Sequence, residues 1–220
     1  MVKDRRQLNN DPGLLRFDEA PKQPKKGRNG NAAPDKYSLD EINQMLAVAT
    51  DDEKDLIQFF LRLGVRDEEA QYAEWSDIET RREDEELIHE FHVREKPEYD
   101  WKPKDTEDRM LPIADALYNR LMERKKRVTG NLIFPNSVGT PDANLIRRLQ
   151  EASNRAKLTK RPTLHKFRRT YASLMIADSD LQTVSTLLGH SDLRTTALYL
   201  APDQVKGRQA SRTAFDGVGD

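Results

Sequence analysis

The sequence predicts a mainly α-helical domain that carries a small antiparallel β-sheet. Apolar residues recur at helical spacing over most of the chain after residue 37, and short segments between the helices have the alternation of strands. The chain has no cysteine, so no disulfide framework replaces a hydrophobic core. With 220 residues, of which 36% are hydrophobic and 34% charged, the chain can bury one core and leaves solvated ends.

The first helices are predicted from their caps. Ser38 and Glu41 have the spacing of a capping box, and apolar residues on one face follow them, so a helix is expected to begin after Ser38. A second amphipathic helix is expected from about Asp52 to Gly64, because glycine is a typical helix end. A short third helix is expected over residues 68–73.

Three short segments are expected to pair as an antiparallel sheet at one edge of the helical domain. Residues 87–93 alternate apolar and polar side chains and include β-branched and aromatic types, which is typical of a strand. Residues 110–113 form a second apolar segment, and residues 75–78 are expected to supply the third strand. The acid-rich stretch 79–86 is interpreted as an exposed turn.

The remaining apolar periodicity predicts five further helices. Their expected ranges are 114–126, 142–157, 164–177, 181–188 and 193–200. Residues 1–36 are rich in proline and lysine and show no period, which indicates a flexible basic linker. Residues 204–220 have little apolar content and are expected to form a tail. Residues 37–203 are therefore expected to form the folded domain.

Charge is unevenly distributed, although the formal net charge is only −1. Residues 51–100 hold 7 Lys and Arg against 18 Asp and Glu, whereas residues 101–220 hold 21 against 13. A polyanion responds to the local face that it meets, so basic clusters at 124–127 and 147–161 are candidates for phosphate contacts. Acidic and basic helices that solvate different sides of the domain would explain the same counts.

The sequence lacks the features of secreted, membrane-spanning and thiolate-metal proteins. No apolar run approaches the roughly 18–20 residues of a membrane span, and the N-terminus has charges but no apolar signal region. Without cysteine, iron–sulfur clusters and cysteine nucleophiles are excluded. His89 and His92 lie three apart in an expected strand, hence on opposite faces, so no metal site is expected. A cytoplasmic location is the default expectation.

Four residues in the C-terminal third suit one kind of chemistry. His165 and Arg168 are neighbours on one face of an expected helix, His190 follows the helix-ending Gly189, and Tyr199 lies nine residues further on. Attack by tyrosine on a phosphodiester builds negative charge on the non-bridging oxygens, which arginine and histidine can stabilise. The set therefore favours phosphoryl transfer, although each residue alone also has an ordinary structural explanation.

In combination, these motifs resemble those of the tyrosine recombinases, also called the phage integrase family. The chain has H-x-x-R at residues 165–168, an L-G-H motif whose His190 lies 22 residues after Arg168, and Tyr199 nine residues after that histidine. The resemblance covers about residues 37–203 and implies the family's catalytic-domain fold. It implies that His165, Arg168 and His190 are catalytic and that Tyr199 is the nucleophile.

The resemblance also implies an earlier arginine. Residues 64–69 fit the family's G-L-R-x-x-E box with valine in place of leucine. Arg66 is therefore expected to be the first catalytic arginine, and Glu69 is expected to orient the local structure. A bare structural role for Arg66, as a charge near the end of the preceding helix, is the alternative.

The family's last catalytic group is a lysine in a β-hairpin, which acts as general acid toward the leaving 5′ oxygen. It lies about eight residues before the proline of a V-P-[LI] strand, and counting back from Pro112 gives Lys104. Lys102 and Lys96 are competitors, because the connection is longer and more acidic here than in family examples.

The resemblance implies a site-specific DNA recombinase that cleaves and rejoins double-stranded DNA through a 3′-phosphotyrosyl intermediate, in a bacterial or phage context. It implies no cofactor, metal or ATP, a tetramer on DNA, a monomer off DNA and no membrane partner. A type IB topoisomerase and a non-catalytic DNA-binding regulator are the alternatives. The family usually places a helical DNA-clamping domain before the catalytic one, and residues 1–36 are expected to be only the linker to such a domain.

Overall fold

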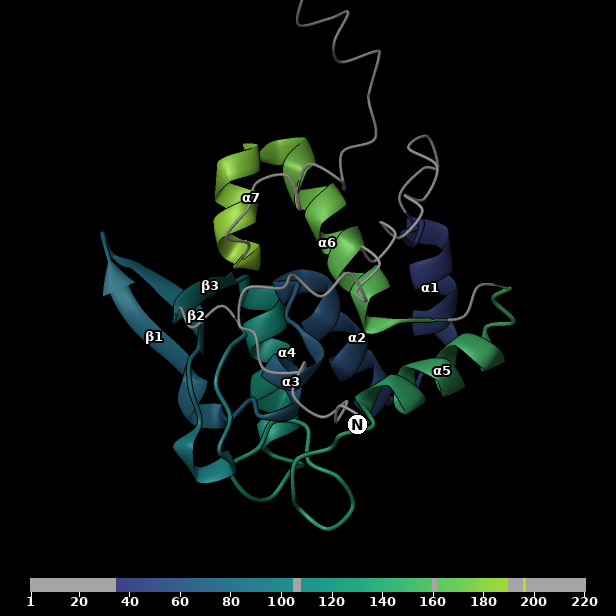
Figure 1. Ribbon diagram of the computed structural model, residues 1–220, viewed down its shortest axis with the longest axis horizontal. Coiled ribbons are helices and arrows are strands. Elements are labelled where there is room, and N and C mark those ends of the chain that lie inside the picture. The colour runs from purple at the N-terminus through teal and green to yellow at the C-terminus, as the bar shows by residue number, and fades with distance from the viewer. Residues whose placement is uncertain (1–34, 105–107, 160–161, 190–195, 197–220) are drawn as a thin grey trace, which may run out of the picture. The chain divides into compact units, whose positions relative to one another are not determined.

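The computed structural model describes residues 35–104, 108–159, 162–189 and 196, and it confirms the expected fold class (Figure 1). The described helices are α1 (Leu39–Val48), α2 (Asp51–Leu63), α3 (Asp67–Gln71), α4 (Asp115–Lys125), α5 (Leu145–Arg155), α6 (Leu164–Asp178) and α7 (Leu181–Leu188). The strands are β1 (Ile78–Glu83), β2 (Glu86–Val93) and β3 (Arg109–Ile113). Residues 1–34 of the expected linker 1–36, the expected tail 204–220 and most of the helix expected at 193–200 lie outside the described residues. Within them, no helix is long and apolar enough to cross a membrane.

Capping boxes begin the first two helices, as the sequence predicts for the first. The Ser38 hydroxyl accepts from the backbone N–H of Glu41 at 3.1 Å, and the Glu41 carboxylate accepts from the N–H of Ser38 at 2.8 Å. Thr50 and Glu53 make the same reciprocal bonds at the start of α2. This helix ends at Gly64, which has the left-handed conformation of a C-terminal cap, with φ +61°.

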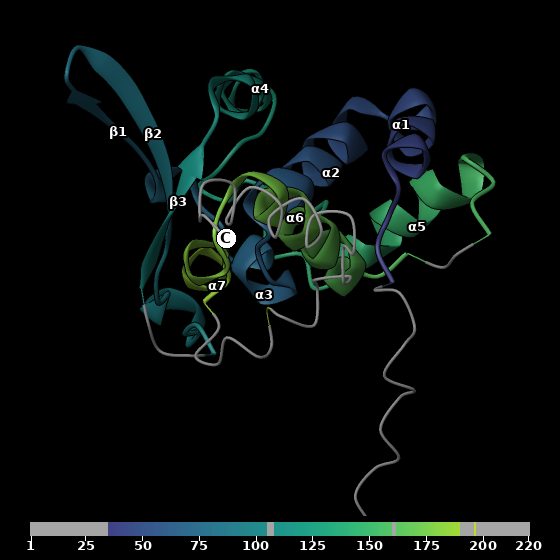
Figure 2. The ribbon, with the colours of Figure 1, turned by 90° about the horizontal axis from the view of Figure 1, so that it is seen from above.

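Helix α2 is the central element of the fold (Figures 1 and 2). It packs against α4, α5, α6 and β3, so apolar side chains are buried on several of its faces. The ring of Phe59 meets the rings of Phe91 in β2 and Phe134 edge-on, with centroids 5.2 and 5.0 Å apart. The core therefore lies around α2, between the sheet and the other helices.

Several basic residues that the sequence offers for phosphate binding are used inside the fold instead. Asp55 of α2 is fully buried and pairs with Arg124 at 3.1 Å and with Arg127 at 2.8 Å. Arg148 of α5 pairs with Asp52 of α2 at 2.9 Å. A buried carboxylate needs such partners, because an unpaired charge in the core is costly. These arginines hold α2, α4 and α5 together.

The sheet is antiparallel in the order β1-β2-β3, with Thr80 opposite His89 and Phe91 opposite Leu111. Two sequence predictions are wrong here. Residues 75–77 form a 3₁₀ turn, and the first strand begins only at Ile78. In the acid-rich stretch 79–86, only positions 84 and 85 form the turn, both with positive φ. The other residues belong to the paired strands, which project from the domain as a hairpin (Figure 1).

The helix expected over residues 142–157 begins later, at Leu145, and ends at Arg155. Asp142 precedes it as an ion-pair partner of Arg148 rather than as a helical residue.

Replacing Gly64 with alanine should destabilise the fold strongly. A Cβ at this position would lie 2.3 Å from Cδ1 of the Tyr171 ring, and φ +61° is unfavourable for a side chain. We expect Gly64→Ala to lower the free energy of unfolding by about 3 kcal/mol. Urea denaturation measures this. Gly130→Ala is the matched control, because Gly130 also has positive φ but no atom within 4 Å of its Cβ position. An equal loss in both variants would contradict the packing argument.

Candidate active site

The centre of the candidate site is the C-terminal end of α7, which lies beside α6 and β3 (Figures 1 and 2). Asp180 caps the start of this helix, and Gly189 ends it in the left-handed conformation with φ +62°. The last carbonyl groups of a helix have no partner within the helix and carry its partial negative charge. Here they accept hydrogen bonds from three arginines, which lie in β3, in α6 and just before α3.

Each of the last three carbonyls accepts a hydrogen bond from a different arginine. Arg109 of β3 donates through Nε to the carbonyl of residue 187 at 3.0 Å. Arg168 of α6 donates to the carbonyl of residue 188, and Arg66 donates through Nη2 to the carbonyl of Gly189 at 2.8 Å. The three bonds bring Arg66 and Arg168, both predicted from the sequence, to adjacent carbonyls of one chain segment.

Arg66 follows the end of α2 and caps the start of α3. Glu69 accepts from its backbone N–H at 2.7 Å and from its Nη1 at 3.1 Å. Glu69 also accepts from Nη2 of Arg109 at 2.7 Å. Burial would raise the pKa of this carboxyl, but Arg109 and then Arg66 hold it below its usual range. Glu69 is therefore ionised and orients Arg66, as the sequence predicts.

Arg168 is almost fully buried and connects two helix ends. Besides its bond to α7, its Nη1 donates to the carbonyl of Gly64 at 2.6 Å. The planar guanidinium can span both acceptors, which a lysine ammonium cannot do in the same geometry. Arg168 thus fixes the end of α2 relative to the end of α7.

His165 lies one turn before Arg168 on α6, as the H-x-x-R spacing predicts. Its side chain is exposed to solvent at one part and partly buried at another. Partial burial of the ring lowers its pKa, and the neighbouring charges of Arg169 and Arg168 lower it further. The imidazole is therefore neutral at neutral pH and can either accept or donate a hydrogen bond.

Helix α6 is held in place by the residues that enter the domain. The backbone N–H of Tyr37 donates to Oγ1 of Thr170 at 2.9 Å, and the Tyr37 ring lies 4.8 Å from the ring of Phe167. Lys166 is buried with its ammonium 4.3 Å from the Tyr37 ring and 3.3 Å from the carboxylate of Asp35. The residues just before α1 therefore fix the position of α6, the helix that carries the histidine and the second arginine.

His190 and Tyr199 lie outside the described residues, so their places in the site stay sequence predictions. The sequence joins His190 directly to Gly189, whose carbonyl Arg66 binds. Tyr171, the other tyrosine of this region, is buried, and burial raises its pKa although Arg168 and Arg109 oppose the change.

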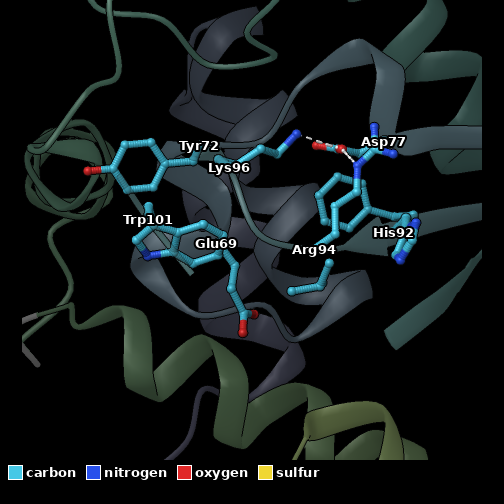
Figure 3. A pocket seen from close by; sticks show the side chains of 9 residues that line it. Glu69, Tyr72, Asp77, His92, Arg94, Lys96 and Trp101 are labelled. Carbon is cyan, nitrogen blue, oxygen red and sulfur yellow. Dashed lines mark hydrogen bonds and ion pairs between the residues drawn. The ribbon is translucent and has the colours of Figure 1, made fainter. Parts of the chain in front are cut away.

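The structure distinguishes the three candidate lysines, of which Figure 3 shows Lys96. Lys96 is buried and its Nζ lies 3.0 Å from the Glu74 carboxylate and 2.7 Å from that of Asp77. This pairing gives Lys96 a structural role. Lys102 and Lys104 are exposed. Lys104 lies just before the segment 105–107, and among the described residues no hydrogen bond or ion pair joins it to either arginine.

The loop before Lys104 is held by aromatic stacking and by a hydrogen bond to residues at α3. Tyr72, which directly follows α3, stacks with Tyr99 and with Trp101, with ring centroids 5.3 Å apart in both pairs. Nε1 of Trp101 donates to the carboxylate of Glu68 at 3.1 Å. A small pocket beside this stack has a volume of only about 10 Å³, which is about the room of one water molecule (Figure 3). It is not a substrate site.

Arg109 is the residue that sequence reasoning missed. It begins a strand of otherwise apolar character, Met110-Leu111-Pro112-Ile113, and its side chain is only 9% exposed. A charged residue in a buried strand needs a specific partner. That mismatch between residue type and expected burial was the signal available in the sequence.

The described part of the site can stabilise an anion. Three guanidinium groups, those of Arg66, Arg109 and Arg168, meet at a helix end whose carbonyls hold them in a fixed arrangement, and those of Arg66 and Arg109 also pair with the Glu69 carboxylate. Such a preorganised cationic cluster suits the charge that develops on the oxygens of a phosphodiester under attack.

Within the described residues, no group of three or more histidine, aspartate or glutamate side chains could hold a metal ion. His89 and His92 contact different partners, Thr80 at 2.9 Å and Asp108 at 3.5 Å respectively.

The model of the phage integrase family matches residues 37–205 of the chain. The chain therefore belongs to the tyrosine recombinase, or phage integrase, family. The match covers the folded domain that the sequence predicts, including all six residues expected in the site.

Two staphylococcal proteins illustrate the relatives. The tyrosine recombinase XerD of Staphylococcus haemolyticus (strain JCSC1435) is 27% identical over 117 residues, which cover 48% of this chain and 40% of that protein. XerD of Staphylococcus saprophyticus subsp. saprophyticus is 28% identical over 107 residues, or 44% of this chain and 36% of that protein. The match spans less than half of either relative.

Solved structures of recombinases share the fold. The XerA recombinase has a TM-score of 0.64 at 19% identity, covering 83% of this chain and 66% of that one. The XerH site-specific recombinase in a pre-cleavage complex with its difH substrate has a TM-score of 0.63 at 20% identity, covering 81% and 53%. A lambda integrase dimer bound to a COC′ core site has a TM-score of 0.58 at 19% identity, covering 74% and 47%.

Proposed function

We propose that residues 37–203 are the catalytic domain of a site-specific DNA recombinase that cleaves and rejoins DNA through a 3′-phosphotyrosyl bond. The observation that carries this proposal is the convergence of Arg66 and Arg168 on the last two carbonyls of α7. The sequence continues from there into His190 and, nine residues later, Tyr199. Family membership and the DNA-bound relatives support double-stranded DNA as the substrate.

In the proposed reaction, Oη of Tyr199 attacks the phosphorus and the bond from phosphorus to the 5′ oxygen breaks. Arg66 and Arg168 bind the non-bridging oxygens, on which negative charge accumulates. His165, which is neutral, can accept the tyrosine proton, and His190 can donate to a phosphate oxygen. Lys104 gives a proton to the leaving 5′ oxygen. Because the phosphotyrosyl bond keeps the energy of the phosphodiester, rejoining by a 5′ hydroxyl needs neither ATP nor a metal.

The experiment that tests this function traps the covalent intermediate. The 220-residue chain is incubated with a library of nicked duplexes that carry random inverted repeats, so that the short fragment released on cleavage diffuses away. We expect DNA-linked protein that survives denaturation, and peptide mass spectrometry should place the nucleotide on Tyr199. Sequencing of the trapped DNA would give the recognition site.

Recombination between two such sites, rather than relaxation of any supercoiled plasmid, separates a recombinase from a type IB topoisomerase. A non-catalytic regulator would yield bound DNA but no adduct.

Lys104 is expected to be the general acid, and the leaving group offers a sharp test. Lys104→Ala should slow cleavage of an ordinary 5′-oxygen substrate by about 10²–10³-fold. On a substrate with a 5′-thiolate leaving group the loss should nearly vanish, because a thiolate leaves without a proton. Single-turnover rates on the two substrates give the comparison.

Lys102→Ala is the matched control, since both lysines are exposed in the same loop. It should cleave both substrates like the wild type. If the thiolate rescued Lys102→Ala instead, the assignment would pass to Lys102. If it rescued neither variant, the general acid would lie elsewhere.

A further inference from the structure

Arg109 makes contacts that differ from those of an ordinary surface arginine. Its Nε donates to the carbonyl of Leu187 at 3.0 Å, and its Nη2 donates to Glu69 at 2.7 Å. A single guanidinium thereby joins the last turn of α7 to the carboxylate that binds Arg66. These two partners are 118 positions apart in the sequence, and β3 brings them together.

The guanidinium of Arg109 also lies against the backbone of Gly189. A Cβ at Gly189 would lie 3.1 Å from Nη1 and 3.2 Å from Cζ of Arg109. The residue that ends α7 is therefore in close contact with this side chain, and glycine meets both demands of the position, the close approach and the positive φ. Arg109 forms one wall of the turn from which the chain continues to His190.

Glu69 couples Arg109 to Arg66. Its side chain is 1% exposed, and its two oxygens are shared between Arg109 and both the backbone and the side chain of Arg66. A buried carboxylate with two cationic partners is stable, whereas loss of one partner leaves it incompletely paired and free to reorient toward the other. The position of Arg66 is therefore tied to the presence of Arg109.

We propose that Arg109 is a positioning residue of the active site, which orients Arg66 through Glu69 and sets the direction of the α7 terminus through the carbonyl of Leu187. It acts through these groups rather than on DNA. The consequence for catalysis rests on the proposed function, whereas the consequence for the α7 terminus does not. Lysine is a poor replacement, because one ammonium can retain the ion pair with Glu69 but lacks the planar fork that also reaches the carbonyl.

The chain offers a closely matched control for Arg109. Asp77 is, like Glu69, a carboxylate whose side chain is 1% exposed and which two cations share. Its partners are Arg94 at 2.9 Å and Lys96 at 2.7 Å, and among the described residues neither donates a hydrogen bond to α7. Arg94→Ala removes one guanidinium from a shared buried carboxylate, as Arg109→Ala does, but leaves the candidate site intact.

The experiment compares wild type, Arg109→Ala, Arg109→Lys and Arg94→Ala on the duplex recovered from the library. At saturating DNA, we expect Arg109→Ala to reduce the single-turnover cleavage rate about 10–100-fold with a Kd within about threefold of wild type. Arg109→Lys should recover part of the rate, and Arg94→Ala should stay within about threefold. Adding Glu69→Gln to Arg109→Ala should cost little more, because both act on Arg66.

The outcomes separate this inference from the proposed function. A wild-type chain that forms no adduct would overturn the function and leave the geometry to be tested by amide hydrogen exchange. Arg109→Ala should then speed exchange in peptides that cover the last turn of α7, and Arg94→Ala should not. Three results would each overturn the positioning role. They are equal hydrogen exchange in the two variants, cleavage by Arg109→Ala at the rate of Arg94→Ala, and an effect of Arg109→Ala on the Kd for DNA alone.

Discussion

Tyr199→Phe should abolish covalent attachment to DNA while the protein stays folded and still binds the duplex. Phenylalanine keeps the aromatic ring but lacks the oxygen that would attack phosphorus, and no cysteine is present to substitute as nucleophile. Adduct on the nicked duplex should fall below about one-thousandth of the wild-type amount. Denaturing gel electrophoresis measures the adduct, and circular dichroism and a binding titration check folding and affinity.

Tyr171→Phe is the matched control for this experiment. Tyr171 also lies in the C-terminal third, next to Arg168 on α6, but it is 4% exposed and its ring lies against Gly64. Burial raises its pKa, so its hydroxyl is a poorer nucleophile than an exposed tyrosine. This variant should keep forming adduct. A chelator should leave both results unchanged. Adduct formation by Tyr199→Phe, or its loss on addition of EDTA to the wild type, would refute the nucleophile assignment.

The helices could be predicted from the sequence because their signals are local. Each signal lies within a few residues of the helix that it predicts. Examples are the capping box at Ser38 and the terminal glycines at 64 and 189. Tertiary packing agrees with local preference over the described helices, whose bounds lie within three residues of the predicted ones. The recombinase motifs were equally accessible, because they depend on residue type and spacing alone.

Strand β1 could not be predicted in the same way. Its side chains are exposed on both faces except at its start, so it has no alternation of apolar and polar residues. It is held by its register against β2 and by contacts such as the ion pair from Arg81 to Glu90 at 3.0 Å. Cross-strand pairing of this kind depends on a partner strand. The acid-rich sequence therefore looked like a turn.

In the site, too, motif spacing could be found in the sequence, whereas contacts between residues far apart in the sequence could not. Spacing identified Arg66 and Arg168, but their shared role at the α7 terminus depends on three elements that meet only in the fold. Arg109 belongs to no motif considered in the sequence, and only the structure places it beside Glu69. Likewise, Lys96 was a competitor of Lys104 in the sequence, and only the structure assigns it to a buried ion pair with Asp77.

Arg168→Ala should lower both the stability and the cleavage rate by large amounts. Its guanidinium is 3% exposed and donates to the carbonyls of Gly64 and Leu188. Removing it leaves two acceptors without this partner in a region closed to water, which should cost about 2–4 kcal/mol of the free energy of unfolding. It also removes charge stabilisation from the reacting phosphate, which should reduce the cleavage rate by about 10²–10³-fold.

The two effects of Arg168→Ala can be separated by measuring cleavage well below the unfolding midpoint of the variant, which urea or thermal denaturation supplies. Arg169→Ala is the matched control, because its guanidinium is next along α6 and only partly buried. It should keep both stability and rate close to wild type. Arg168→Lys should regain part of the stability by reaching one carbonyl, but little of the rate, because the ammonium cannot bind two oxygens side by side. If the folded Arg168→Ala variant cleaved DNA as fast as Arg169→Ala, Arg168 would be only a structural link between α2 and α7, and phosphate stabilisation would have to come from other groups.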